Sequence, residues 1–215
     1  MTEMNISKLK VLFIDWFNTL TSRAFLHKLR QDDPQLFSRI DQKIFDQSPT
    51  GWHLEWARGK IGQEEVAEII ARDGLLSKQE VLDIFADCCK HQNVDNEEIW
   101  EVIAKIRKRG VKVVLATDNW DIFCRYTIPA LSLERHFDDI LSSDTVGFLK
   151  RDTDSGKLLF FEGYLRKNGI DYEECLLIDD SPANISRCCE CGLPVLKVSS
   201  PIDTLIFLKE LEEKL

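Results

Sequence analysis

The chain has 215 residues, of which 44% are hydrophobic and 30% are charged, and its formal net charge is -9 at pH 7. This composition is ordinary for a globular protein, and the length suits one sizeable domain or a core with a smaller insert. The acidic balance argues against nucleic acid as a partner, because nucleic-acid binding needs basic patches. No apolar run approaches the roughly 20 residues that span a bilayer, so we expect no membrane partner either.

The N-terminal segment Met1–Ser7 lacks a basic stretch followed by an apolar one, so we expect no signal peptide and a cytoplasmic location. The seven cysteines fit this expectation, because an odd count in an unsecreted chain argues against a disulfide framework. Three of them cluster at 188–191, but zinc sites need a second ligand pair, and Cys88-Cys89 with His91 has no convincing spacing. We interpret the cysteines as small apolar side chains of helices.

The first predicted strand covers residues 10–14 and stops at Asp15. Its apolar residues do not alternate with polar ones, which is typical of a strand buried on both faces in a parallel sheet. A carboxylate at the carboxyl end of such a strand lies in the crevice where open α/β sheets bind ligands. The alternative is that Asp15 only caps the segment that follows.

Residues 21–97 contain no comparable buried strand, and we predict that they form helices. Asp33-Pro34 is typical of an N-cap followed by proline in the first helical position. Ser77 and Glu80 have the spacing of a capping box, with apolar residues at helical intervals after them. This part of the chain is therefore predicted to be a helical insert.

From residue 98 onward, helices and strands alternate, which favours an α/β fold with a Rossmann-like parallel sheet and helices on both faces. The first helix of this part is expected to begin at a capping box, Asp95-Asn96-Glu97-Glu98. Strands are predicted over 111–117, 140–143, 175–178 and 195–198, and a terminal helix over 202–215.

Polar side chains follow the ends of these strands. Thr117 ends one strand, Lys150 comes soon after the next, and Asp179-Asp180 end the one after that. Because the carboxyl ends of parallel strands meet at one edge of a sheet, we expect these side chains to lie near Asp15. Carboxylates, a hydroxyl and an ammonium group together suit a bound phosphate and a divalent cation.

These motifs resemble those of the haloacid dehalogenase-like hydrolase superfamily, and the resemblance covers most of the chain. That family has a strand ending in DxDx(T/V), a strand ending in Ser or Thr, a Lys, and a strand ending in an acid pair. The corresponding residues here are Asp15-Trp16-Phe17-Asn18-Thr19, Thr117, Lys150 and Asp179-Asp180, in the same order. The stretch Ile178–Ile185 is the most specific single match, whereas Arg151 stands where the family usually has proline.

The resemblance implies a role for each of these residues. Asp15 would be the nucleophile and would form an aspartyl-phosphate intermediate. Thr117 and Lys150 would bind and neutralise the transferred phosphoryl group. Magnesium (Mg2+) would be held by Asp15, Asp180 and the backbone carbonyl of Phe17. Supporting roles fall to Thr19, Asp179 and Asn184.

The same resemblance implies a division of the chain into two units. Residues 1–20 and 98–215 would form the α/β hydrolase core, and residues 21–97 a helical cap that closes over the active site and selects the substrate. The expected partner is a small phosphorylated metabolite. We interpret Trp56 as part of the packing inside the cap, whereas the polar Arg58 is a candidate for substrate contact. The sequence leaves the oligomeric state open.

One position departs from the family pattern. The family's phosphatases carry a second Asp two residues after the nucleophile, as general acid for the leaving group, and here that residue is Phe17. A phenyl ring transfers no proton at any pH, although the backbone carbonyl of this residue is retained. The expected activity is therefore a phosphate-ester hydrolysis whose leaving group needs no acid from this position.

Three other functions stay open. A 2-haloacid dehalogenase also has an aromatic residue at this position, but members of that branch work without magnesium and lack an Asp-Asp-Ser site. A phosphonate-cleaving enzyme needs a cap lysine for a Schiff base, for which Lys28, Lys43 and Lys60 are candidates. A catalytically silent protein could retain the pocket to bind a phosphorylated ligand.

Overall fold

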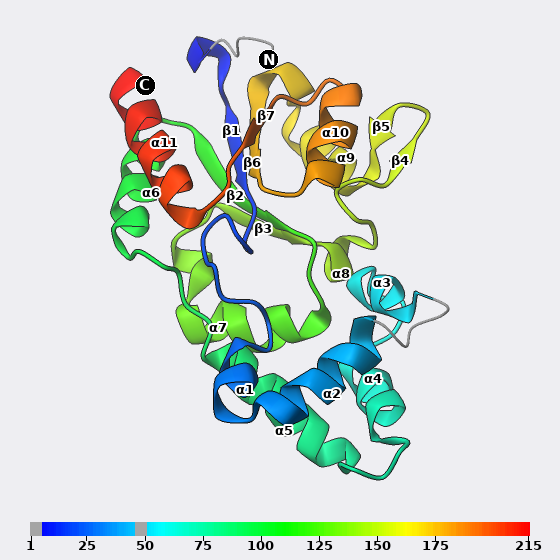
Figure 1. Ribbon diagram of the computed structural model, residues 1–215. Coiled ribbons are helices and arrows are strands. Elements are labelled where there is room, and N and C mark those ends of the chain that lie inside the picture. The colour runs from blue at the N-terminus through cyan, green and yellow to red at the C-terminus, as the bar shows by residue number, and fades with distance from the viewer. Residues whose placement is uncertain (1–5, 46–50) are drawn as a thin grey trace.

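The computed structural model describes residues 6–45 and 51–215, so most of the N-terminal segment used to judge a signal peptide lies outside the described residues. At its centre is a five-stranded sheet in the order β3-β2-β1-β6-β7, in which every neighbouring pair is parallel (Figure 1). This confirms the predicted α/β class. The strands of the sheet are β1 (Val11–Ile14), β2 (Lys112–Thr117), β3 (Asp139–Ser142), β6 (Cys175–Asp179) and β7 (Val195–Lys197).

Helices connect these strands, and a short hairpin, β4 (Thr153–Asp154) with β5 (Lys157–Leu158), follows Lys150. None of the described helices combines the length and apolarity needed to cross a membrane. The α-helices are α1 (His27–Asp32), α2 (Pro34–Phe45), α3 (Trp52–Ala57), α4 (Gln63–Ala71), α5 (Lys78–Lys90), α6 (Glu98–Lys108), α7 (Ile128–Leu131), α8 (Ser143–Val146), α9 (Leu159–Asn168), α10 (Pro182–Glu190) and α11 (Pro201–Lys214).

The sheet is the middle of three layers. Successive residues of β1 point to opposite faces, and all four are fully buried. Leu12 and Ile14 pack in the cluster that includes the apolar faces of α6 and α11, whereas Val11 and Phe13 pack in the cluster that includes α9 and α10. Figure 1 shows these two helix pairs on opposite sides of the strands. Burial on both faces explains why β1 is a continuous apolar run.

Helices α1–α5 gather at one end of the molecule, below the sheet in the view of Figure 1. They share a separate apolar cluster, which includes the fully buried Trp56 and Phe85. Ile122 and Trp120, which follow β2, also pack into this cluster. The helical part of residues 21–97 is thus present as expected, while the division into core and cap at residues 20 and 98 stays a prediction.

The helix starts were predicted with mixed success. Asp33 Oδ1 accepts hydrogen bonds from the backbone N–H of Gln35 and Leu36, and Ser77 forms the expected capping box with Glu80. The capping box expected at the start of α6 was wrong. Asp95 Oδ1 instead accepts from the backbone N–H of Ser22, 3.1 Å away, so that side chain ties the loop after β1 to the segment that precedes α6.

Candidate functional site

The candidate site lies where β1, β2 and β6 end. In the sheet, Ile14 of β1 is aligned with Leu115 of β2 and with Ile178 of β6. Asp15 therefore comes just beyond β1 beside Asp179, and Thr117 ends the strand on the other side. The chain runs from β1 outward to β2 and β3 and later returns on the opposite side of β1 with β6 and β7. Open α/β sheets bind ligands at such a reversal of strand order.

Lys150 joins the acidic residues of this site. Its side chain is completely buried, and its Nζ lies 2.7 Å from Asp15 Oδ1 and 2.5 Å from Asp179 Oδ2. The same ammonium donates to the carbonyl oxygen of Ala116 at 3.2 Å. A buried ammonium between two carboxylates has the partners that it needs, because a buried charge is costly unless it is paired.

The charges of these groups set their pKa values against one another. Burial raises the pKa of Asp15 to about 7, an effect that the Lys150 ammonium opposes and the Asp179 carboxylate increases. Burial by itself lowers the pKa of Lys150, but the carboxylates of Asp15, Asp179 and Asp118 together hold it above its ordinary value. Lys150 therefore stays protonated at neutral pH, and its positive charge favours the ionised form of Asp15.

The two carboxylates of the acid pair at the end of β6 have different surroundings. Asp179 is fully buried and engaged, since Oδ1 accepts from the backbone N–H of Ser181 at 2.8 Å and Oδ2 accepts from Lys150. Asp180 is half-buried, and its Oδ2 accepts from Asn18 Nδ2 at 3.1 Å. Asn18 adopts the left-handed backbone conformation, with φ 54°, which asparagine tolerates better than most residues.

A divalent cation fits this arrangement. Among the described residues, the group of acidic, histidine or cysteine side chains able to hold a metal is Asp15, Asp179 and Asp180, with ligand atoms all within 4.8 Å of one another. A backbone bridge between Phe17 and Thr21 uses the carbonyls of Trp16 and Thr21, which leaves the Phe17 carbonyl oxygen outside it. Oxygen donors of these kinds are the ones that magnesium prefers.

The other expected site residues lie at the same edge of the sheet. Thr117 is buried at the end of β2 and is aligned with Ser142 of β3. Thr19 and Asn184 are also buried, and their Oγ1 and Oδ1 atoms have no hydrogen-bond partner in the part of the chain that the structure describes. Asn184 lies in the first turn of α10, and its Nδ2 is 3.4 Å from Asp179 Oδ2. An acceptor without a partner at this place suits a water molecule of a metal site.

Asp118 is a residue of the site that sequence reasoning passed over. Its Oδ1 accepts from the backbone N–H of Lys150 at 2.9 Å, and its Oδ2 accepts from Asn184 Nδ2 at 3.3 Å. Burial raises the pKa of Asp118, with Lys150 acting in the opposite direction. Its place directly after Thr117 was the available signal, because it shares the strand end that drew attention to the threonine.

A cavity of about 210 Å³ lies next to these residues, between the strand ends and the helices α1–α5. Trp16, Phe17, Asp118 and Asn119 line it on the side of the sheet. From the helical side come the segment 23–25 and Phe45, together with residues that follow β2. The site therefore opens into a space walled largely by aromatic side chains.

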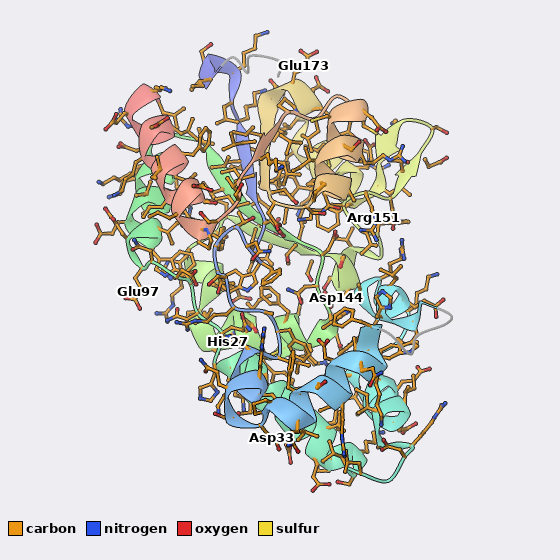
Figure 2. All side chains as sticks on the ribbon, in the orientation of Figure 1. His27, Asp33, Glu97, Asp144, Arg151 and Glu173 are labelled. Atoms are coloured by element: carbon orange, nitrogen blue, oxygen red, sulfur yellow. The ribbon has the colours of Figure 1, made fainter. Side chains whose placement is uncertain are left out.

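Two contacts hold α3 against the α/β part near Lys150. The guanidinium of Arg58 binds both carboxylate oxygens of Asp152 at 2.7 Å, and Asp152 Oδ2 also accepts from the backbone N–H of Leu149. Beside this pair, a Cβ added to Gly59 would lie 2.0 Å from the carbonyl oxygen of Asp144. Figure 2 labels Asp144 on α8, next to α3. Arg58 is thus engaged in an ion pair, and its expected contact with a substrate stays a prediction.

Comparisons with known proteins bear on the family and the fold of the chain. The family model described as haloacid dehalogenase-like hydrolase matches residues 9–186. A curated relative, phosphoglycolate phosphatase of Mesorhizobium japonicum, is 27% identical over 141 residues, which is 66% of this chain. The match spans 59% of the length of that relative.

Solved structures share the fold at low sequence identity. A HAD-like family hydrolase from Porphyromonas gingivalis has a TM-score of 0.69 and 17% identity, covering 95% of this chain and 98% of its own. A HAD family enzyme from Bacteroides thetaiotaomicron, in complex with magnesium and inorganic phosphate, has a TM-score of 0.65 and 17% identity, with 89% and 95% covered. L-2-haloacid dehalogenase from Xanthobacter autotrophicus has a TM-score of 0.63 and 14% identity, with 88% and 77% covered.

Proposed function

Because the chain belongs to the haloacid dehalogenase-like hydrolase family, we propose that it is a magnesium-dependent phosphatase that acts on a small phosphorylated compound through Asp15. The observation that carries the proposal is the meeting of Asp15, Asp179, Asp180 and Lys150 at the ends of β1 and β6. Three carboxylates and one ammonium group suit a cation and a phosphate better than they suit a neutral ligand. The phosphatase named among the relatives supports a phosphate ester as the substrate class.

In the proposed reaction a carboxylate oxygen of Asp15 attacks phosphorus, and the bond from phosphorus to the leaving oxygen breaks with its electron pair on that oxygen. Water then attacks the acyl phosphate, which releases inorganic phosphate and restores Asp15. Lys150 lies 2.7 Å from the nucleophile and offsets the negative charge that gathers there. Thr117 donates a hydrogen bond to the phosphoryl group from the end of β2.

Asp15, the Phe17 carbonyl and Asp180 would hold magnesium, with Asp179 and Asn184 orienting its surroundings and Thr19 steadying the loop. The metal, when bound, would neutralise charge on the phosphoryl oxygens. Asp180 accepts a hydrogen bond from Asn18 and is half-buried, so its carboxylate is accessible to a cation.

Phe17 limits the leaving groups that this site can handle. The residue is 41% exposed and lines the cavity, so the position where the resemblance implies an acid in related phosphatases presents an apolar surface here. General acid catalysis contributes about 10²–10⁴-fold, and the loss is largest for poor leaving groups. Aryl and acyl phosphates should therefore react much faster than alkyl phosphates.

The alternative of a phosphonate-cleaving enzyme finds less support at this site. It needs a lysine in the cavity, yet Lys28 pairs with Asp32, and Lys43 pairs with Asp73 at 2.6 Å. Arg23 is the positively charged side chain among the described residues that line the cavity, and Lys60 is not among them. A dehalogenase would have no use for the acid pair at the end of β6. A catalytically silent binding protein would have the same site, so only a measurement of turnover distinguishes it from the proposed phosphatase.

The test is kcat/KM for phosphate esters of graded leaving-group pKa, with and without magnesium, for the parent and for Phe17→Asp and Asp15→Asn. We expect a steep dependence in the parent, a gain for alkyl esters in Phe17→Asp, and no turnover in Asp15→Asn. Ile206→Asp is the matched control, since it adds an acid at an exposed apolar position of α11. Failure of both the parent and Phe17→Asp to hydrolyse any ester would favour the dehalogenase, phosphonate or binding readings.

A further inference from the structure

The cavity beside Phe17 is aromatic on several sides. The ring of Phe25 contacts that of Trp120 edge-on, with centroids 5.2 Å apart, and Trp16 contacts Phe123 in the same way at 5.4 Å. Surroundings of this kind favour a flat aromatic ligand, which gains both apolar burial and edge or stacking contacts. The aromatic side chains that line the cavity are Trp16, Phe17, Phe25, Phe45, Trp120 and Phe123.

Several polar atoms around this cavity are already used inside the protein. Trp120 Nε1 donates to the carbonyl of His53 at 3.1 Å, and its ring stacks on Trp56. Gln92 Nε2 donates to the carbonyl of Ala24 at 3.0 Å. Thr127 Oγ1 donates to a backbone carbonyl of α5. These side chains therefore contribute walls to the cavity, and a polar ligand group must find another partner.

Arg23 is that partner. It is the lining side chain with a positive charge, it is half-buried, and no described residue gives its guanidinium an ion pair or a hydrogen bond. Its backbone is fixed, because its N–H donates to Thr21 Oγ1 at 3.1 Å and Gln92 holds the next residue. The acidic lining residue, Asp118, already accepts from Lys150 and Asn184. A guanidinium in apolar surroundings pairs strongly with a carboxylate.

We propose that this cavity binds the leaving group of an aryl phosphate, and that Arg23 pairs with a carboxylate on that aromatic ring. The inference rests on the proposed phosphatase function and narrows its substrate. It agrees with Phe17, since a phenolate leaves with the electron pair of the broken phosphorus–oxygen bond and needs no proton at that moment. Arg23 makes and breaks no covalent bond, so it determines specificity and takes no part in the chemistry.

The test compares 4-carboxyphenyl phosphate with 4-carbamoylphenyl phosphate. The two esters have the same ring and differ in charge, and the amide, which withdraws electrons more strongly, has the better leaving group. A preference for the carboxylate therefore cannot come from leaving-group ability. We expect kcat/KM for the carboxylate to be at least about tenfold higher, mainly through KM, which is the effect of one charge-assisted hydrogen bond.

Variants separate Arg23 from the general charge of the protein. Arg23→Gln should reduce the carboxylate-to-amide ratio to about one or below, and Arg23→Lys should retain part of it. Arg166→Gln, which removes an exposed cation from α9, should keep the ratio of the parent. An unchanged ratio in Arg23→Gln would overturn the inference.

Two measurements on the parent keep the inference testable if Arg23→Gln does not fold. Product inhibition by 4-hydroxybenzoate should be at least about tenfold stronger than inhibition by 4-hydroxybenzamide, and equal inhibition would overturn the assignment. Turnover of 4-nitrophenyl phosphate with magnesium tests the phosphatase function itself. If that ester is hydrolysed but the carboxylate ester is not preferred, only the role of Arg23 is refuted. If that ester is not hydrolysed, both the phosphatase proposal and the inference are refuted.

Discussion

Replacing Lys150 with methionine removes a buried positive charge and keeps an unbranched side chain of similar length. In the parent the ammonium is completely buried and lies 2.7 Å from Asp15, 2.5 Å from Asp179 and 3.2 Å from the Ala116 carbonyl. Because methionine fills most of the same space, the cavity contribution is small and the loss of charge dominates. The change leaves two buried carboxylates without their shared cation.

The expected cost is large for a single substitution. Breaking a buried ion pair by removing one partner destabilises a protein by about 3–5 kcal/mol, since the remaining charge has neither water nor a partner. For a chain of this size, each kcal/mol lowers Tm by about 2–4 °C, so the fall in Tm should be about 6–20 °C. Lys157→Met is the matched control, because that lysine is 67% exposed and makes one loose pair with Glu162. It should cost about 1 kcal/mol at most.

Thermal unfolding followed by circular dichroism at pH 7 and pH 5, with a chelator present, measures this effect and its sign. Burial already raises the pKa of Asp15 to about 7, and removing Lys150 raises it further. When the pKa of a carboxyl group is higher in the folded than in the unfolded state, the folded protein loses stability as pH rises from the unfolded pKa to the folded pKa. The difference in Tm between the parent and Lys150→Met should therefore be greater at pH 7 than at pH 5. A fall no larger than that of Lys157→Met, or a deficit that grows at pH 5, would refute this reasoning.

Three further outcomes are expected. Asp180→Asn should weaken magnesium binding at least about tenfold in a calorimetric titration, because it removes one charged ligand, and unchanged binding would contradict the assignment. Gly59→Ala should lower Tm more than Gly74→Ala. Both glycines have positive φ, but a Cβ at Gly59 would meet the Asp144 carbonyl whereas Gly74 has open space. Equal losses of Tm would argue against a tight contact at Gly59. Arg58→Gln and Asp152→Asn should be non-additive by about 1–3 kcal/mol in a double-mutant cycle of urea unfolding, and additive losses would mean that the pair contributes nothing.

The sheet was predictable because its strands carry their own signal. Each central strand is buried on both faces, so an apolar run marks it without reference to the rest of the chain. Parallel strands place their carboxyl ends together, and that rule brought Asp15, Thr117 and Asp179 to one edge before any contact was known. The capping box predicted at the start of α6 was wrong because the Asp95 carboxylate accepts a hydrogen bond from a loop far away in the sequence. Local spacing carries no information on such a partner.

The chemistry between the site residues was less accessible. That Lys150 would bind both Asp15 and Asp179 depends on the path of the chain through α8, which no local pattern specifies. Asp118 was overlooked because the backbone N–H that it accepts from belongs to a residue 32 positions away. The cavity draws on segments around residues 16–25, 45, 89–92 and 118–127, whose meeting is a property of the packed fold.

Phe17 connects the two parts of the functional argument. Its backbone carbonyl lies outside the bridge with Thr21, as the proposed metal-ligand set requires, whereas its side chain lines the cavity in a residue that is 41% exposed. The motif resemblance implies an acid at this position in the family's phosphatases, and a phenyl ring in its place leaves the proposed ligand set intact. The same exchange would remove a proton donor, and it adds an aromatic ring to the wall of the cavity. Both effects favour one class of substrate, an ester whose leaving group is aromatic and departs without a proton. Because one side chain causes both, Phe17→Asp should weaken aryl-ester selectivity through KM as well as through kcat.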